Sequence, residues 1–127
     1  MNYVDTIADY LEENNYTVQV GKLYNTSADN SINLNKVVVY PKEAAYRQCI
    51  DKLKGYNNQQ VKILVHWNKS YTDSIAVAER IYSLFDSNVY NNLIFTPRQS
   101  SPIELGTDSY DIWEFVIELN IIEMTQI

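Results

Sequence analysis

The sequence is poor in the residues from which common catalytic and ligand-binding motifs are built. Its 127 residues include one cysteine, one histidine and three glycines. The single Cys49 excludes an internal disulfide and fits a reducing compartment. Three isolated glycines cannot form a glycine-rich phosphate loop, and one histidine without a cysteine pair gives no zinc-site spacing. We therefore expect no cofactor.

Long hydrophobic runs and an excess of basic residues are also missing. No stretch of about 18 apolar residues occurs, so we expect no membrane span and no membrane partner. The N-terminus lacks a basic segment followed by an apolar one, so we expect no signal peptide. The formal net charge of −6 argues against a general nucleic-acid binder, because such proteins need Lys and Arg to neutralise phosphates.

The composition that is present is that of a globular protein. Hydrophobic residues make up 46% of the chain and charged residues 20%, so we expect one domain over residues 1–127. The eleven tyrosines are also notable. Tyrosine is enriched at protein interfaces, but an AT-rich genome would raise its frequency without functional meaning.

Hydrophobic periodicity divides the chain into helices and strands. Val4, Ile7 and Leu11 recur at helical spacing, and Asn14 marks the end of this helix. A second helix is predicted over about residues 71–86, where Ser70 followed by Asp73 forms a capping-box pattern. The predicted strands cover residues 16–20, 37–40, 61–67, 93–95 and 108–124, the predicted loops cover 25–35 and 98–107, and residues 42–60 are ambiguous but allow a short helix.

This order of elements predicts the fold class. Clustered strands with helices that can lie on one face indicate an α+β protein. We expect two layers, namely a mostly antiparallel sheet of about five strands and two main helices packed on one of its faces.

The last predicted strand, residues 108–124, carries most of the functional information. Side chains alternate across a strand, so one face should pack on the core and the other should be wet and acidic. The apolar face holds Trp113, Phe115, Ile117, Leu119 and Ile121, and the polar face holds Glu114, Glu118 and Asn120. Residues 99–127 contain six acids and no Lys or Arg, whereas residues 1–98 contain ten of each sign. The entire net charge therefore lies in this C-terminal segment.

The acids of this segment are the main candidates for chemistry. Glu104, Asp108 and Asp111 lie close together in sequence and are weak candidates for a divalent cation site. Their spacing does not match a known calcium loop, and a solvated loop is the simpler explanation. Glu114 and Glu118 are separated by about 13 Å along a strand, which is too far for a catalytic dyad. They are better explained as a charged surface, and we expect no catalytic residues.

The single cysteine and the single histidine, both outside this segment, carry side chains that are common in catalysis. Cys49 and His66 could in principle form a nucleophile–base pair. Cys49 lies on an apolar helical stripe, which is typical of a small core residue. His66 is expected on the exposed or interface face of its strand.

Several motifs are similar to those of a known family. Residues 61–67 form a strand pattern, which leads into a helix pattern with Ala78, Ile81 and Leu84, and residues 108–121 form the closing strand. This order resembles the minor capsid and tail terminator proteins of long-tailed bacteriophages. Their sequences show a strand, an A-x-x-I-y-x-L helix, and a closing strand that begins with Asp or Gly and an aromatic pair.

The resemblance implies a structural protein of the virion or of a prophage, assembled in the host bacterial cytoplasm. Family members form a ring, commonly a hexamer, which caps the tail tube, joins it to the head connector proteins and lets DNA pass through without specific binding. An acidic ring lining would repel DNA phosphates. The candidates for the lumen or the subunit interface are Glu114, Glu118, Asp108, Asp111 and Arg98.

Two alternatives to a structural assembly protein remain at this stage. One is a small α+β protein-binding or regulatory module without catalytic activity, which grips a partner through its sheet edge or acidic face. The other is an enzyme that uses a metal bound by the carboxylates of residues 104–111.

Overall fold

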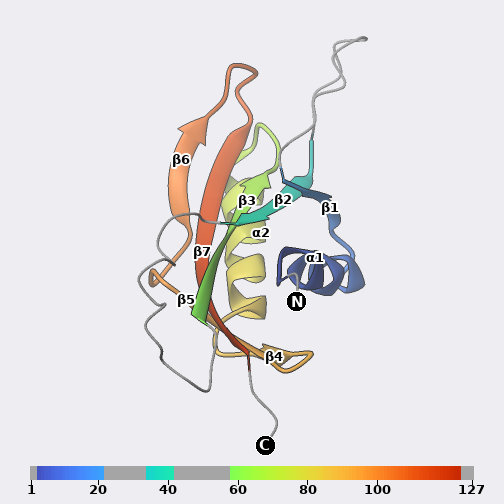
Figure 1. The fold of residues 1–127 in the computed structure, drawn as a ribbon. Helices are drawn as coiled ribbons and strands as arrows, with labels where there is room; N and C mark the ends of the chain where they lie inside the picture. Colours follow the sequence, from blue (N-terminus) through green and yellow to red (C-terminus); the bar gives the residue numbers. More distant parts are fainter. Residues whose placement is uncertain (1–2, 22–33, 42–57, 124–127) are drawn as a thin grey trace, which may run out of the picture.

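A seven-stranded sheet with two helices on one face forms the described part of the chain (Figure 1). The structure is a computed structural model that describes residues 3–21, 34–41 and 58–123. The elements are α1 (Tyr3–Glu13), β1 (Thr17–Val20), β2 (Lys36–Pro41), β3 (Asn58–His66), α2 (Tyr71–Leu84), β4 (Val89–Tyr90), β5 (Leu93–Pro97), β6 (Ile103–Thr107) and β7 (Trp113–Glu123). The predicted α+β class with two layers is confirmed, and the sheet has more strands than expected.

The long strand β7 lies at the centre of the sheet. The strand order is β1-β2-β3-β7-β5-β4, with β6 paired to β7 as well. One edge of β7 pairs with β3 over nine residues. Its other edge is shared, because β6 pairs with residues 113–116 and β5 pairs with residues 119–123. All of these pairs are antiparallel, and only β1 and β2 run parallel.

Both helices bury their apolar stripes against the same face of the sheet. Ile7 and Leu11 of α1 and Ile81 of α2 are fully buried. The helix α2 begins as its sequence predicts, because the Ser70 hydroxyl accepts a hydrogen bond from the backbone N–H of Asp73. The odd-numbered residues of β7 from Phe115 to Ile121 complete this core, which confirms their predicted orientation.

Tyrosine hydroxyls connect elements that are distant in sequence. Tyr3 in α1 donates a hydrogen bond to Glu123 at the end of β7, at 2.7 Å. Tyr90 in β4 donates a hydrogen bond to Glu13 at the end of α1, at 2.6 Å. The Tyr90 ring also packs on the ring of Tyr10, with 4.6 Å between centroids. Tyrosine side chains therefore link α1 to β4 and to the end of β7.

The prediction of a loop over residues 98–107 is wrong in its second half. Residues 103–107 form β6, which pairs with the start of β7 in spite of a bulge between Glu104 and Gly106. The bulge breaks the alternation by which a strand is recognised in a sequence. The two-residue strand β4 was also missed, and β7 begins at Trp113 and not at residue 108. Most of the loop predicted over residues 25–35 and of the ambiguous segment 42–60 lies outside the described residues. Residues 58–60 of that segment belong to β3, which therefore begins before the predicted strand over 61–67.

The described helices are short. Neither of them is long and apolar enough to cross a membrane.

Truncation of β7 tests its place in the core. Leu119 is fully buried, so Leu119→Ala should lower the free energy of unfolding by about 2–5 kcal/mol through lost burial and a residual cavity. Leu105 in β6 is 54% exposed, so the same substitution there should change stability by no more than about 0.5 kcal/mol. Urea denaturation of both variants measures the difference, and equal losses would contradict the described packing.

The Tyr90–Glu13 contact predicts a stability change at high pH. The hydrogen bond to Glu13, with smaller effects of burial and nearby negative charge, raises the pKa of Tyr90 from about 10 to about 12. The neutral phenol is favoured in the fold, so its stabilisation is complete below pH 10 and is lost as the pH rises through 12. The difference in unfolding free energy between wild type and Tyr90→Phe should therefore shrink over this range. The explanation would be refuted if this free-energy difference stayed constant over the pH range. It would also be refuted if the difference between wild type and Tyr110→Phe, at an exposed tyrosine, shrank equally.

Candidate functional site

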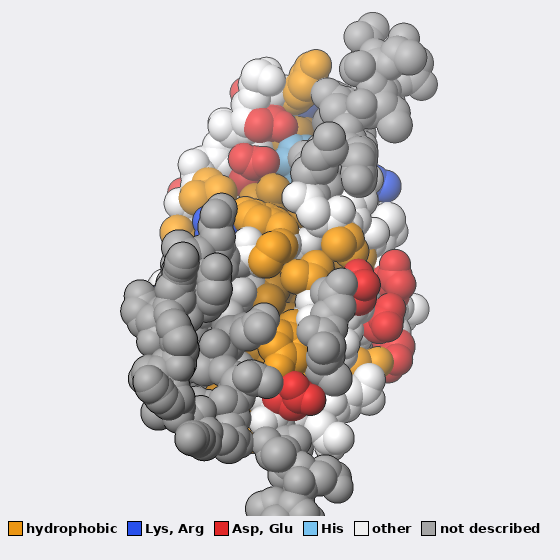
Figure 2. Space-filling model, viewed as in Figure 1, with side chains coloured by type: hydrophobic (Ala, Val, Ile, Leu, Met, Phe, Trp, Pro, Cys, Tyr) orange, Lys and Arg blue, Asp and Glu red, His pale blue; other side chains and the backbone are white. Residues whose placement is uncertain are grey.

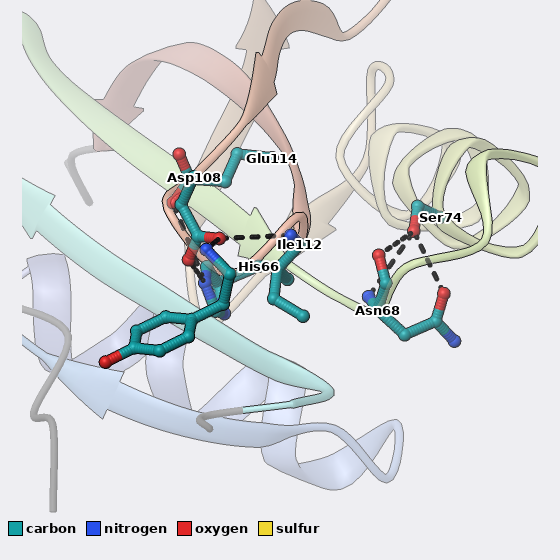
Figure 3. Close-up of polar contacts among 7 residues, drawn as sticks. His66, Asn68, Ser74, Asp108, Ile112 and Glu114 are labelled. Carbon is teal, nitrogen blue, oxygen red and sulfur yellow. Dashed lines mark hydrogen bonds and ion pairs between the residues drawn. The ribbon is translucent and has the colours of Figure 1, made fainter. Parts of the chain in front are cut away.

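The helix-free face of the sheet carries a cluster of three ionisable side chains near the start of β7. His66 at the end of β3 is the direct cross-strand partner of Glu114 in β7. Asp108 follows β6, and the turn between β6 and β7 places its carboxylate against the same histidine (Figure 3). We call these three residues the His66 cluster. Pairing of β3 and β6 with β7 thus brings together residues that are up to 48 positions apart.

Distances within the His66 cluster are short. The Nε2 atom of His66 lies 2.8 Å from Oδ2 of Asp108 and 3.9 Å from Oε2 of Glu114. The His66 side chain is only 3% exposed, whereas those of Asp108 and Glu114 are 25% and 23% exposed. The expectation that His66 lies on the exposed or interface face of its strand is correct for the face, which is the one opposite the helices. The side chain is nevertheless buried there, beside the carboxylates of Asp108 and Glu114.

Backbone hydrogen bonds fix the orientation of Asp108. Its Oδ1 atom accepts hydrogen bonds from the backbone N–H groups of Tyr110 and Ile112, at 2.8 and 3.0 Å. This arrangement is an Asx-type turn, in which an aspartate caps the chain that follows it. Asp111 completes the turn with a φ of +66°, and Ile112 is fully buried beneath it. The second oxygen, Oδ2, is thereby directed at His66.

The pKa values of the Asp108 and Glu114 carboxyl groups shift in opposite directions in this environment. Burial by itself would raise the pKa of Asp108, but hydrogen bonds from His66 and from the two backbone N–H groups lower it overall. Burial raises the pKa of Glu114, the negative charge of Asp108 adds to this, and His66 only partly opposes it. The charged form of Asp108 is therefore favoured, and its Oδ2 lies within hydrogen-bond distance of His66 Nε2. Glu114 is therefore the member of the cluster whose charged form is disfavoured.

Of the three acids predicted as cation ligands, the structure places only Asp108 in the cluster. Glu104 lies on the helix face of the sheet, in register with Phe115, and accepts a hydrogen bond from the Tyr71 hydroxyl at 3.1 Å. Asp111 is exposed at the turn. His66 and Glu114 were not foreseen as partners of Asp108, because the register of β3 against β7 is not visible in the sequence.

Glu118 and Arg98 interact with each other within the chain. Arg98 Nη1 lies 3.6 Å from Glu118 Oε1, and Gln99 Nε2 donates a hydrogen bond to the same oxygen at 3.0 Å. The backbone N–H of Arg98 also bonds to the Glu118 carbonyl at 2.8 Å. Because this segment covers Glu118, its side chain is only 14% exposed. The prediction of a wet acidic face is therefore too simple at this position.

The helix-free face, against which none of the described helices packs, also has an apolar part, which was not predicted from the sequence. Figure 2 shows a band of hydrophobic side chains along the middle of this face. Successive strands contribute a row of cross-strand neighbours, which we call the apolar row: Val38, Leu64, Val116 and Ile103. Val38 and Val116 are 1% and 6% exposed, yet they lie outside the main core. Charged rows flank the apolar row, with His66 and Glu114 on one side and Lys62 and Glu118 on the other.

A second polar cluster attaches α2 to the same end of β7 (Figure 3). Ser74 is fully buried, and its hydroxyl lies 3.3 Å from both the backbone and side-chain oxygens of Asn68. The Asn68 carbonyl accepts a hydrogen bond from the backbone N–H of Trp113 at 3.0 Å. The start of α2, the end of β3 and the start of β7 thus form one connected unit around the candidate site.

A comparison with models of protein families matches most of the chain to a known family. A family model described as bacteriophage tail terminator protein matches residues 10–123. The matched region begins within α1 and ends with β7, so it includes the His66 cluster and the apolar row. A comparison with curated proteins finds no match.

Substitutions at Asp108 separate its two interactions. Asp108→Ala removes the acceptor for two backbone N–H groups and the partner of His66, so we expect a loss of about 1–3 kcal/mol in unfolding free energy. The amides of Tyr110 and Ile112 should then exchange faster with solvent. Asp108→Asn keeps an acceptor oxygen for the turn, so amide protection should be largely retained. Hydrogen exchange measured by NMR checks both variants, and unchanged exchange in Asp108→Ala would show that the carboxylate does not hold the turn.

Proposed function

The chain belongs to the bacteriophage tail terminator protein family, and from this premise we propose that it closes the tail tube as a ring at the head–tail junction. Family membership makes it a structural protein of the phage tail, which is a component of the virion and interacts with other tail or head proteins. The proposal adds the ring form, a hexamer, and the passage of DNA through its centre. The match over residues 10–123 is the observation that carries it.

The two faces of the sheet support a protein that functions in an assembly. Helices cover one face, and the other bears the apolar row. On the helix-free face the cross-strand partners Gln60 and Asn120 each have a buried side-chain oxygen without a hydrogen-bond donor among the described residues. Each oxygen of this kind costs about 1–3 kcal/mol, so a rearrangement on assembly that supplies a donor would stabilise the assembled form.

Opposite edges of the sheet support a closed ring. A ring of identical subunits needs head-to-tail contacts between two different surfaces of each copy. The edge strands β1 and β4 lie at opposite ends of the strand order, and each exposes a valine, with Val20 41% and Val89 56% exposed. Edge strands that expose apolar side chains are typical sites of association.

The acids of the C-terminal segment divide into two groups under this proposal. Glu104 and Asp111 are exposed on the β6–β7 hairpin, which projects at one end of the sheet (Figure 1). We assign these two to the lumen, where negative charge lets DNA slide without binding. The other four candidates form ion pairs within the subunit: Asp108, Glu114, Glu118 and Arg98. They therefore affect the electrostatic potential of the lumen or of a subunit interface, and we do not assign them direct contacts with a neighbour.

Ring formation and tail capping provide the test. Light scattering and negative-stain microscopy of the purified protein, alone and with purified tail tubes, should show rings that cap one tube end. In a phage lacking the gene, tubes should exceed their normal length, because an uncapped end continues to add subunits. Val20→Lys and Val89→Lys should each abolish capping while the fold is retained. Thr72→Lys, at an exposed position of α2, serves as the charge-matched control. A strict monomer with and without tubes, together with tails of normal length in the deletion, would refute the proposal.

A further inference from the structure

We propose that His66, Asp108 and Glu114 form a binding site for one transition-metal dication of the zinc type. Imidazole nitrogen together with two carboxylate oxygens is a donor set that suits Zn²⁺. Magnesium and calcium prefer sites built from oxygen alone. The proposal is independent of ring formation, since all three ligands come from one subunit.

The spacing of the donor atoms fits a single ion. Ligand atoms about 2.0–2.2 Å from a tetrahedral zinc lie roughly 3.3–3.6 Å from one another. In the His66 cluster the distances from Nε2 to the two carboxylate oxygens are 2.8 and 3.9 Å. All three donor atoms lie within 4.8 Å of one another. Small side-chain rotations would bring the three donor atoms to these spacings. His66 would bind through an unprotonated Nε2, with its proton on Nδ1 or released on binding.

The ligands are already oriented as metal ligands usually are. A ligating carboxylate is commonly fixed by hydrogen bonds to the oxygen that does not face the metal. Asp108 has this arrangement, because Tyr110 and Ile112 donate to Oδ1 and leave Oδ2 directed at the cluster. His66 is 98% buried, and its Nε2 points toward the two acids. A buried imidazole directed at two carboxylates distinguishes this site from a surface group of acids.

The charge of the cluster also favours a cation. Two carboxylates face one imidazole, so with both acids ionised the negative charge exceeds what a neutral or singly charged histidine can balance.

Solvent can reach the site from one side. Asp108 and Glu114 are about one quarter exposed, and Figure 2 shows the histidine next to acidic side chains at the surface of the helix-free face. An ion can therefore enter without unfolding, and water would occupy its fourth position. Bound metal would link the end of β3, the β6–β7 turn and the start of β7.

Titration of the full-length protein with Zn²⁺ after removal of metal by chelation tests the proposal. Calorimetry should give one site per chain with a dissociation constant of about 10 µM or tighter. The melting temperature should rise with added zinc. Replacement of zinc by Co²⁺ should give the visible absorption of a four-coordinate site with nitrogen and oxygen ligands. Titration with Mg²⁺ should show no comparable binding.

Variants identify the ligands. Glu114→Gln and Asp108→Asn keep side-chain shape and should each weaken zinc binding at least about tenfold, as should His66→Gln. Glu104→Gln and Asp111→Asn remove exposed acids from the same hairpin and should leave the affinity unchanged, as should Cys49→Ser, which removes the only thiol. Circular dichroism in chelator confirms folding, and Glu114→Gln decides the result if His66→Gln does not fold. Absence of saturable zinc binding, or binding that survives Glu114→Gln and Asp108→Asn, would overturn the proposal.

Discussion

The pairing of β7 with three other strands is the constraint on which the rest of the structure depends. β3 occupies one edge of β7, and β5 and β6 divide the other. The helix face of β7 supplies Phe115, Ile117, Leu119 and Ile121 to the core on which both helices pack. Its other face supplies Glu114, Val116 and Glu118 to the His66 cluster, the apolar row and the Arg98 contact. A one-residue slip of β7 would exchange these two sets, so the register fixes the core and the candidate site together.

The parts of the fold that follow from local periodicity were predictable from the sequence. The stripe of α1, the Ser70 cap of α2 and the core face of β7 are each encoded within about a dozen residues, and the structure confirms them. β6 was not predictable in this way, because its Leu105 bulge and exposed Glu104 interrupt the alternation of a strand. The five-strand expectation consequently fell short of the seven-stranded sheet.

The candidate site was harder to predict, since its parts come from three elements. Asp108 was recognised as a candidate ligand, but Glu104 lies on the helix face of the sheet, and Asp111 is exposed in the Asp108 turn and outside the cluster. The true neighbours, His66 and Glu114, are set by the β3–β7 register and by the Asx-type turn. The lack of a zinc-site spacing excluded the known motifs, whereas strand pairing can assemble a nitrogen and two carboxylates without any such spacing. The apolar row was missed for a related reason, because Val38, Leu64, Val116 and Ile103 come from four separate strands.

Under the proposed function, the helices cover one face of the sheet, while its edges and the β6–β7 hairpin are available to neighbouring subunits and to the channel. The most direct test is a cryo-electron microscopy reconstruction of the tail end that carries this protein. The account predicts a closed ring in which the β1 edge of one subunit approaches the β4 edge of the next, with Glu104 and Asp111 lining the channel. A ring with these two acids on its outer wall, or a tail end without a ring of this protein, would contradict it.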